Sequence, residues 1–272
     1  MKPLKNHTLL YDRDCPLCAL YTDAFIKTGL LDENGRTAYE EGITLYAGKL
    51  DETKACNEIA LINTRSGNVT YGVESLLLIL ASRFPSLKIL TQQKVLVLIL
   101  KKIYAFISFN RKVIATSANY TTQTCVPEFK LFYRLLYIIL SAVFTSTILL
   151  HYSRLLYPLL PPSNMTREYL ICFGQLIFQS AILLCIRSKK TMLFDYLGNM
   201  MTVSLLGALL LIPALLVHHW LVLSPFLFLG YFFAVVMCMF LHHMQRVKNI
   251  KAPFWLSYTW VAYRCLVLLL IL

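Results

Sequence analysis

Acidic residues are scarce in the second half of this 272-residue chain: residues 131–272 contain two, against ten Lys and Arg. Residues 1–130 contain 12 acidic and 16 basic residues, so the net charge of +12 divides into +4 and +8. Charged residues make up only 15% of the chain, whereas 57% are hydrophobic. This composition excludes an intrinsically disordered chain and an ordinary soluble domain. The basic residues of the second half are separated by long apolar runs, which is typical of membrane-flanking charge and speaks against a nucleic-acid partner.

A secretory signal is also missing from the N-terminal segment. Before the first acidic residues, that segment has only a short apolar stretch at Leu9 to Tyr11. A signal peptide needs a longer continuous apolar core. We therefore expect that the first domain is not exported.

The first 115 residues predict a small α/β domain. Short apolar runs bounded by turn residues predict strands at 8–11, 42–46, 58–63 and 69–71, the last two joined by a hairpin turn. Helical spacing predicts helices at 15–30 and 73–81. Residues 87–109 predict an amphipathic helix that packs on the sheet or lies on a bilayer surface, because Lys101 and Lys102 interrupt its apolar run.

The remainder predicts an all-α transmembrane bundle of about five helices over residues 131–272, after a linker at 116–130. The candidate spans are residues 131–150, 169–186, 196–217, 221–241 and 254–272. Each is close to the roughly 20 residues that a crossing needs. The break between the third and fourth spans is short, at His218 to Trp220.

Basic residues predict the orientation of this bundle. They cluster before the first span, after the second and after the fourth, which all lie on one side of the membrane. The opposite side has only Arg154 and Arg167. The positive-inside rule therefore predicts a multi-pass protein of the cell membrane, with the lipid bilayer as a partner and the first domain in the cytoplasm.

The most specific local feature is the segment YDRDCPLC at residues 11–18, in which a predicted strand leads into a helix. Thiols three residues apart at a helix N-terminus can form a disulfide, and the free N–H groups there stabilise a thiolate. We therefore predict Cys15 as the nucleophile and Cys18 as the resolving thiol. Pro16 fixes the start of the helix. Arg13 would favour the Cys15 thiolate, whereas Asp12 and Asp14 would oppose it.

Two other interpretations of the CxxC remain open, a structural zinc site and a pair of inert buried thiols. Zinc would need a second pair of ligands, yet Cys56 and Cys125 stand alone and His7 is the only His of the domain. We therefore expect no metal and no cofactor. Cys56 is interpreted as a small buried hydrophobe in preference to a third redox partner, and Cys125 as a free thiol of the linker.

Three separated signatures resemble the DCC family of thiol-disulfide oxidoreductases. They are LYD followed by CPLC at residues 10–18, the segments at 57–63 and 71–75, and Phe109-Asn110-Arg111. The resemblance covers about residues 8–115 and implies a thioredoxin-like fold, with Cys15 and Cys18 as the redox pair and Asn110 and Arg111 in supporting positions.

The chain departs from the family pattern at two points. Arg13 stands where the family usually has a glycine. No proline precedes the strand at 58–63, so the cis-proline substrate platform of thioredoxins cannot be assigned there. The resemblance therefore implies a type of reaction more than a substrate.

In the predicted bundle, Arg264 lies about halfway along the fifth span. An ionisable residue at that depth is by default a candidate for function. Asp195, Gln175 or Gln179 is its expected partner, or else a lipid phosphate. A structural polar contact is expected in preference to a ligand or transport role. The pairs His218-His219 and His242-His243 lie at opposite ends of their spans, which indicates interfacial histidines and not a shared metal site.

Together these features predict a membrane-tethered thiol-disulfide oxidoreductase that acts on a protein or small-molecule disulfide. One alternative is a regulator in which oxidation of Cys15 and Cys18 changes how the domain meets the bundle. Another is a transporter or channel whose first domain is a scaffold.

Overall fold

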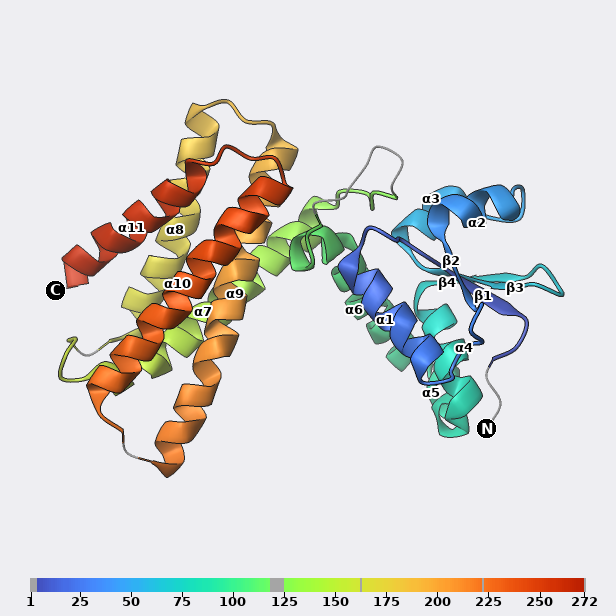
Figure 1. Ribbon diagram of the computed structural model, residues 1–272, viewed down its shortest axis with the longest axis horizontal. Helices are drawn as coiled ribbons and strands as arrows, with labels where there is room; N and C mark the ends of the chain where they lie inside the picture. The colour runs from blue at the N-terminus through green and yellow to red at the C-terminus, as the bar shows by residue number, and fades with distance from the viewer. Residues whose placement is uncertain (1–3, 118–124, 162, 222, 272) are drawn as a thin grey trace. The chain divides into compact units, whose positions relative to one another are not determined.

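The computed structural model describes residues 4–117, 125–161, 163–221 and 223–271. The chain divides into two compact units at the junction of Tyr133 and Arg134, and each unit is described here by itself (Figure 1). Of the predicted linker at 116–130, residues 118–124 lie outside the described residues, as does the predicted last residue of the fifth span.

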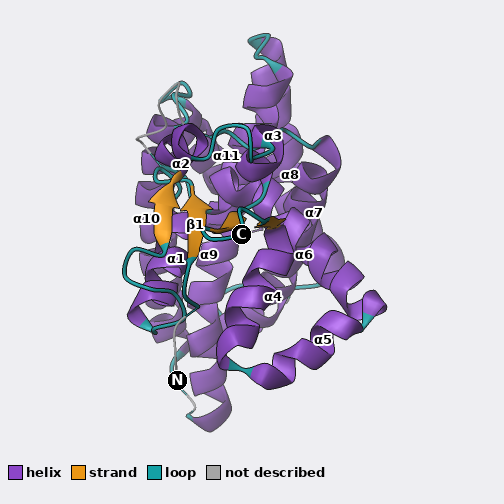
Figure 2. Ribbon diagram, turned by 90° about the vertical axis from the view of Figure 1, so that its right-hand side faces the viewer, coloured by secondary structure: helices purple, strands orange, loops and turns teal. Residues whose placement is uncertain are grey.

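The described part of the first unit contains a four-stranded sheet, drawn in orange in Figure 2. Its strands are β1 (His7–Tyr11), β2 (Arg36–Ala38), β3 (Ala60–Asn63) and β4 (Val69–Tyr71), in the order β2-β1-β3-β4. β1 is parallel to β2 and antiparallel to β3, and β3 is antiparallel to β4. The βαβ order and the hairpin predicted from the sequence are both present.

Helices cover both faces of this sheet. The helices are α1 (Pro16–Lys27), α2 (Tyr39–Leu45), α3 (Glu52–Asn57), α4 (Gly72–Arg83), α5 (Lys88–Gln92) and α6 (Lys94–Ile114), with a 3-10 turn η1 at Pro85–Leu87. Leu9 and Leu61 pack with residues of α1, α4 and α6, whereas Leu10 and Ile62 pack with residues of α2 and α3. Successive residues of a strand point to opposite faces, so β1 and β3 each contribute to both cores.

The strand predicted at residues 42–46 is wrong, because this segment lies in the helix α2. Tyr39, Gly42 and Tyr46 are spaced as one helical face, and all three lie against Leu10 or its core cluster. A Cβ at Gly42 would lie 2.3 Å from Leu10 Cδ2, so glycine allows the close approach. Glu40 and Glu41 occupy the first turn, where the helix dipole favours acidic residues. The parallel partner of β1 is instead β2, at residues 36–38.

The amphipathic helix predicted at 87–109 is present as η1, α5 and α6. α6 packs on α4, and the Tyr104 hydroxyl accepts a hydrogen bond from the Ile59 backbone N–H at 2.9 Å. Its outer face leaves several apolar side chains exposed, which are Val95, Leu98, Ile99, Ile103 and Ile107. Packing within the unit therefore fixes one face of α6, and a bilayer contact of the other face stays a prediction.

The second unit is helical. Its helices are α7 (Leu131–Ser153, which begins in the first unit), the 3-10 turn η2 (Arg154–Leu156), α8 (Met165–Cys185), α9 (Lys190–Trp220), α10 (Pro225–Asn249) and α11 (Leu256–Ile271). Among the described residues, four helical segments are long and apolar enough to cross a membrane: Leu131–Leu156, α8, α9 and α10. The predicted fifth span is α11, with 16 residues. Its length of roughly 24 Å is less than the hydrocarbon thickness of about 30 Å.

Candidate functional site

The CxxC segment lies where the sequence predicted it, between the end of β1 and the start of α1. Cys15 is the N-cap residue of α1, and Pro16 follows at the first helical position. The Cys18 backbone N–H donates a hydrogen bond to Cys15 Sγ at 3.4 Å. The loop before the helix is closed by Asp12, whose carbonyl accepts from the Cys15 N–H at 3.3 Å. The Cys15 sulfur therefore occupies the position at which a capping oxygen normally satisfies the helix N-terminus.

Both sulfurs of the CxxC lie in the interior of the first unit. Cys15 is 0% exposed and Cys18 4% exposed, and Asp12 beside them is 5% exposed. Both cysteines are free thiols. A disulfide substrate therefore reaches Cys15 only when the residues that cover it move aside.

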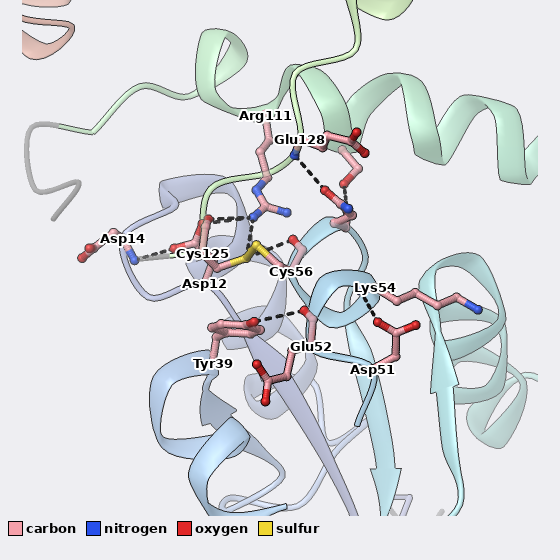
Figure 3. The surroundings of a disulfide bond; sticks show 12 residues. Asp12, Asp14, Tyr39, Asp51, Glu52, Lys54, Cys56, Arg111, Cys125 and Glu128 are labelled. Atoms are coloured by element: carbon pink, nitrogen blue, oxygen red, sulfur yellow. Dashed lines mark hydrogen bonds and ion pairs between the residues drawn. A yellow bond between two sulfur atoms is a disulfide. The ribbon is translucent and has the colours of Figure 1, made fainter. Parts of the chain in front are cut away.

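Arg111, from the C-terminal part of α6, supplies the cation of the site. Its Nη2 lies 3.3 Å from Asp12 Oδ2 and 3.2 Å from the carbonyl oxygen of Cys125 (Figure 3). The side chain is buried, and its neighbour Asn110 donates to the carbonyl of Tyr133 at 3.0 Å. The Asn-Arg pair implied by the family resemblance thus has separate contacts: Asn110 binds backbone, and Arg111 pairs with Asp12.

Arg13 does not fill the role predicted for it. It is exposed and forms an ion pair with Glu41, also exposed, at the start of α2. Charge beside the thiols comes instead from Arg111, which is nearly a hundred residues away in the sequence. The local sequence therefore suggested the wrong cation for the thiols, because Arg111 comes close to them only through tertiary packing.

These contacts separate the two thiols in acidity. A hydrogen bond with the Cys18 thiol lowers the pKa of Cys15 to about 7, helped by the Cys18 backbone N–H and Arg111 and opposed by burial and Asp12. The hydrogen bond with Cys15, together with burial, raises the pKa of Cys18. Burial also raises the pKa of Asp12, although the nearby Arg111 acts in the opposite direction. Of the two thiols, Cys15 is the one with thiolate character at neutral pH.

The predictions for the two remaining cysteines of the first unit are wrong. Cys56 and Cys125 form a disulfide between α3 and the segment that follows α6 (Figure 3). Cys125 Sγ lies 3.4 Å from Arg111 Nη2. Cys56 is half-buried and Cys125 is buried. The two cysteines are 69 residues apart, so no local pattern relates them.

The disulfide and Cys18 of the CxxC border one small cavity of about 10 Å³. Cys18, Cys56, Cys125, Asp12 and Arg111 all contribute to its wall. A space of this size has room for about one water molecule. The first unit therefore holds four sulfur atoms and one buried ion pair in a single neighbourhood.

Metal ligands do not gather anywhere in the described part of the chain: it has no group of three His, Cys, Asp or Glu side chains placed to hold an ion. His243 is buried and lies between Ser257 Oγ, at 3.1 Å from Nδ1, and the Tyr196 hydroxyl, at 3.3 Å from Nε2. It therefore packs inside the bundle between α9 and α11, and the interfacial depth predicted for the histidine pairs stays a prediction.

Asp195, one of the partners expected for Arg264, pairs with Arg134 instead. Asp195 Oδ1 accepts from Arg134 Nη1 at 2.6 Å, which joins α9 to α7. Arg264 instead lies over the Trp260 ring, 5.1 Å from its centroid, and its Nε is buried without a hydrogen-bond partner among the described residues. Stacking on an indole face partly compensates a buried guanidinium.

No family model, curated protein or solved structure matches this chain. The resemblance to the DCC family therefore stays an expectation that depends on the residues quoted for it.

Proposed function

We propose that the first unit is a thioredoxin-like domain of the DCC type that exchanges thiols and disulfides at Cys15 and Cys18, and that the helices of the second unit tether it to the cytoplasmic side of a membrane. The main support is the Cys15 sulfur at the N-cap of α1, with its pKa lowered to about 7. A thiolate at a helix N-terminus is the usual nucleophile of disulfide exchange.

The topology of the first unit supports the same proposal. A parallel pair, β1 and β2, is joined through α1, and an antiparallel hairpin, β3 and β4, leads into α4. This βαβ-ββα order, with helices on both faces, is what a thioredoxin-like domain needs. The CxxC follows the C-terminal end of β1, at the edge of the sheet where α1 begins.

In the proposed reaction, the Cys15 thiolate attacks one sulfur of a substrate disulfide and releases the other as a thiolate, which takes a proton. Cys18 then loses its proton and attacks Cys15 Sγ. This step releases the second substrate thiolate and leaves a Cys15–Cys18 disulfide. Two electrons pass from the dithiol to the substrate, and the reverse sequence oxidises a substrate dithiol. The charge of Arg111 favours the thiolate of Cys15 and that of Cys18.

The burial of both thiols favours a second candidate, a redox-sensing regulator. Oxidation within a buried pair changes the packing around Asp12 and Arg111, and α6 carries that change toward the following segment. A sensor of this kind needs no large substrate at Cys15.

Trapping tests the main proposal. In the full-length protein in membranes, Cys18→Ser should accumulate mixed disulfides with client proteins or glutathione at Cys15, detected on non-reducing gels and by peptide mass mapping. Cys15→Ser/Cys18→Ser is the control that must lose them, and Cys185→Ser, which removes an exposed thiol of α8, must not. If no adduct depends on Cys15, the exchange function is refuted.

A further inference from the structure

The four sulfur atoms of the first unit suggest more than one redox pair. We propose that the Cys56–Cys125 disulfide is a second redox centre, which exchanges electrons with the Cys15–Cys18 dithiol and links it to external thiol partners. This inference rests on the proposed exchange function. It assigns the route by which external thiols and disulfides oxidise the buried Cys15–Cys18 pair or, in the reverse direction, reduce it.

The two cysteine pairs of the first unit lie next to each other. Cys18, Cys56 and Cys125 border one cavity of about 10 Å³, which has room for about one water molecule. No separate partner fits between the two pairs. Cys15, Cys18 and Cys125 are buried, whereas Cys56 is half-buried. Cys56 is therefore the sulfur of the four that an external thiol reaches most readily.

Arg111 contacts one sulfur of the second pair. Its Nη2 lies 3.4 Å from Cys125 Sγ and 3.3 Å from Asp12 Oδ2. A guanidinium beside one sulfur of a disulfide stabilises that sulfur as a leaving thiolate. When a thiolate attacks Cys56 Sγ, Cys125 is therefore the favoured leaving group.

The proposed exchange transfers two electrons in two successive attacks. The Cys18 proton passes to the Cys15 thiolate, and Cys18 Sγ attacks Cys56 Sγ; the Cys56–Cys125 bond breaks and Cys125 leaves as a thiolate. The Cys15 thiol then gives up its proton, by way of water, to the Cys125 thiolate. Cys15 attacks Cys18 Sγ and releases Cys56, which is protonated by water. The first pair is oxidised to a disulfide, the second is reduced to a dithiol, and no other oxidant is consumed.

The predicted compartment supports a redox role over a structural one. Disulfides in the cytoplasm are usually transient and catalytic, because reducing systems keep other thiols reduced. If the first unit faces the cytoplasm, as the basic residues predict, a permanent staple at Cys56–Cys125 is out of place, whereas a relay pair is expected.

A trapping variant tests the internal step. Full-length Cys15→Ser protein in detergent is held at pH 8.5 and then treated with iodoacetamide. We expect a Cys18–Cys56 disulfide with alkylated Cys125, because Cys15 is absent and cannot resolve the intermediate. In peptide mass mapping, the alkylated fraction of Cys125 should exceed at least fivefold that in Cys15→Ser/Cys18→Ser, the control that cannot form this disulfide. An unchanged Cys56–Cys125 disulfide in both variants would overturn the relay.

A rate measurement distinguishes loss of the relay from a folding defect. Dithiothreitol should reduce the Cys15–Cys18 disulfide at least fivefold more slowly in Cys56→Ser/Cys125→Ser than in the wild type. If loss of the Cys56–Cys125 disulfide only loosened the fold, the Cys15–Cys18 disulfide would be more exposed and its reduction would be faster. An equal or faster rate therefore contradicts the relay. If Cys18→Ser traps clients while both of these tests fail, the exchange function stands and only the relay is wrong.

Discussion

Asp12 and Arg111 form a buried ion pair in the first unit, with 3.3 Å between Oδ2 and Nη2. Asp12 follows β1 and closes the loop before α1, whereas Arg111 lies near the end of α6. Their contact brings a fixed positive charge to a helix N-terminus that already favours anions. The pKa of Cys15 therefore depends in part on Arg111, which lies almost a hundred residues further along the chain.

Replacing Arg111 should weaken the nucleophile. In Arg111→Gln, the pKa of Cys15 should rise from about 7 toward its usual value, because a cation that favours the thiolate is lost. Alkylation of Cys15 by iodoacetamide at pH 7 should slow by about two- to fivefold, since the rate follows the thiolate fraction. Rates measured by mass spectrometry between pH 5 and 9 give the pKa.

Asp12→Asn is the matched control with the opposite sign. The Asp12 carboxylate raises the pKa of Cys15, so its removal should lower that pKa and speed alkylation at pH 6. If both variants shift the pKa of Cys15 in the same direction, general loosening of the fold and not charge explains the effect.

The stability of the reduced protein should depend on pH through the two thiols. The pKa of Cys15 is lowered from 9.0 to about 7 in the folded state, so the unfolded state binds more protons between pH 7 and 9 and stability rises over that range. The gain is at most about 2 to 3 kcal/mol. The pKa of Cys18 is raised, so above pH 9 the folded state holds the extra proton and stability falls again.

Pulse proteolysis in urea on the detergent-solubilised full chain measures this profile for fragments of the first unit. The Cys15→Ser/Cys18→Ser variant lacks both titrating groups and should show a flatter profile. An identical profile in the two proteins would mean that Cys15 has an ordinary acidity.

The Cys56–Cys125 disulfide should also stabilise the first unit. It closes a loop across 69 residues of sequence, for which restriction of the unfolded chain contributes about 4 kcal/mol. Cys56→Ser/Cys125→Ser should lose up to about this amount in the same proteolysis assay. The Cys172→Ser variant, which removes a buried free thiol of the second unit, controls for the loss of a cysteine as such.

Sequence alone predicted the features that depend on short-range order. The strand at 8–11, the hairpin and the helix after the CxxC follow from local periodicity and turn residues, and each is present. The 42–46 segment was misread because its alternating Ile43 and Leu45 resemble a strand, whereas contact with Leu10 selects the helix. Such a choice depends on tertiary packing, which a local pattern does not contain.

The residues of the candidate site also fall into two groups, those that are close in the sequence and those that only tertiary packing brings together. Cys15, Cys18 and Asp12 lie within one loop and turn, so spacing alone places them together. The contacts that set their chemistry join residues far apart in the chain: Arg111 with Asp12, and Cys56 with Cys125. The count of eight cysteines allowed many pairings, and spacing does not choose among them.

In the second unit, the pair of Arg134 and Asp195 should hold α7 against α9. The Arg134 side chain is 5% exposed, whereas the Asp195 side chain is 44% exposed. Asp195→Asn leaves a buried cation without its counter-ion and should destabilise the bundle by about 1 to 3 kcal/mol, less than for a fully buried pair. Thermal aggregation of the detergent-solubilised protein measures the loss, and Asp195→Glu should retain most of the stability. Equal melting of all three proteins would show that the pair is dispensable.

Orientation can be decided with two exposed positions, Ser66 in the β3–β4 turn and His219 at the end of α9. The positive-inside rule predicts that Ser66 lies in the cytoplasm and His219 on the opposite side of the membrane. A membrane-impermeant maleimide on intact cells should therefore label His219→Cys and spare Ser66→Cys, and permeabilised cells should show both. Wild-type protein gives the background from its native thiols. Labelling of Ser66→Cys in intact cells would place the first unit outside the cytoplasm, where the Cys56–Cys125 disulfide is expected to be permanent and structural.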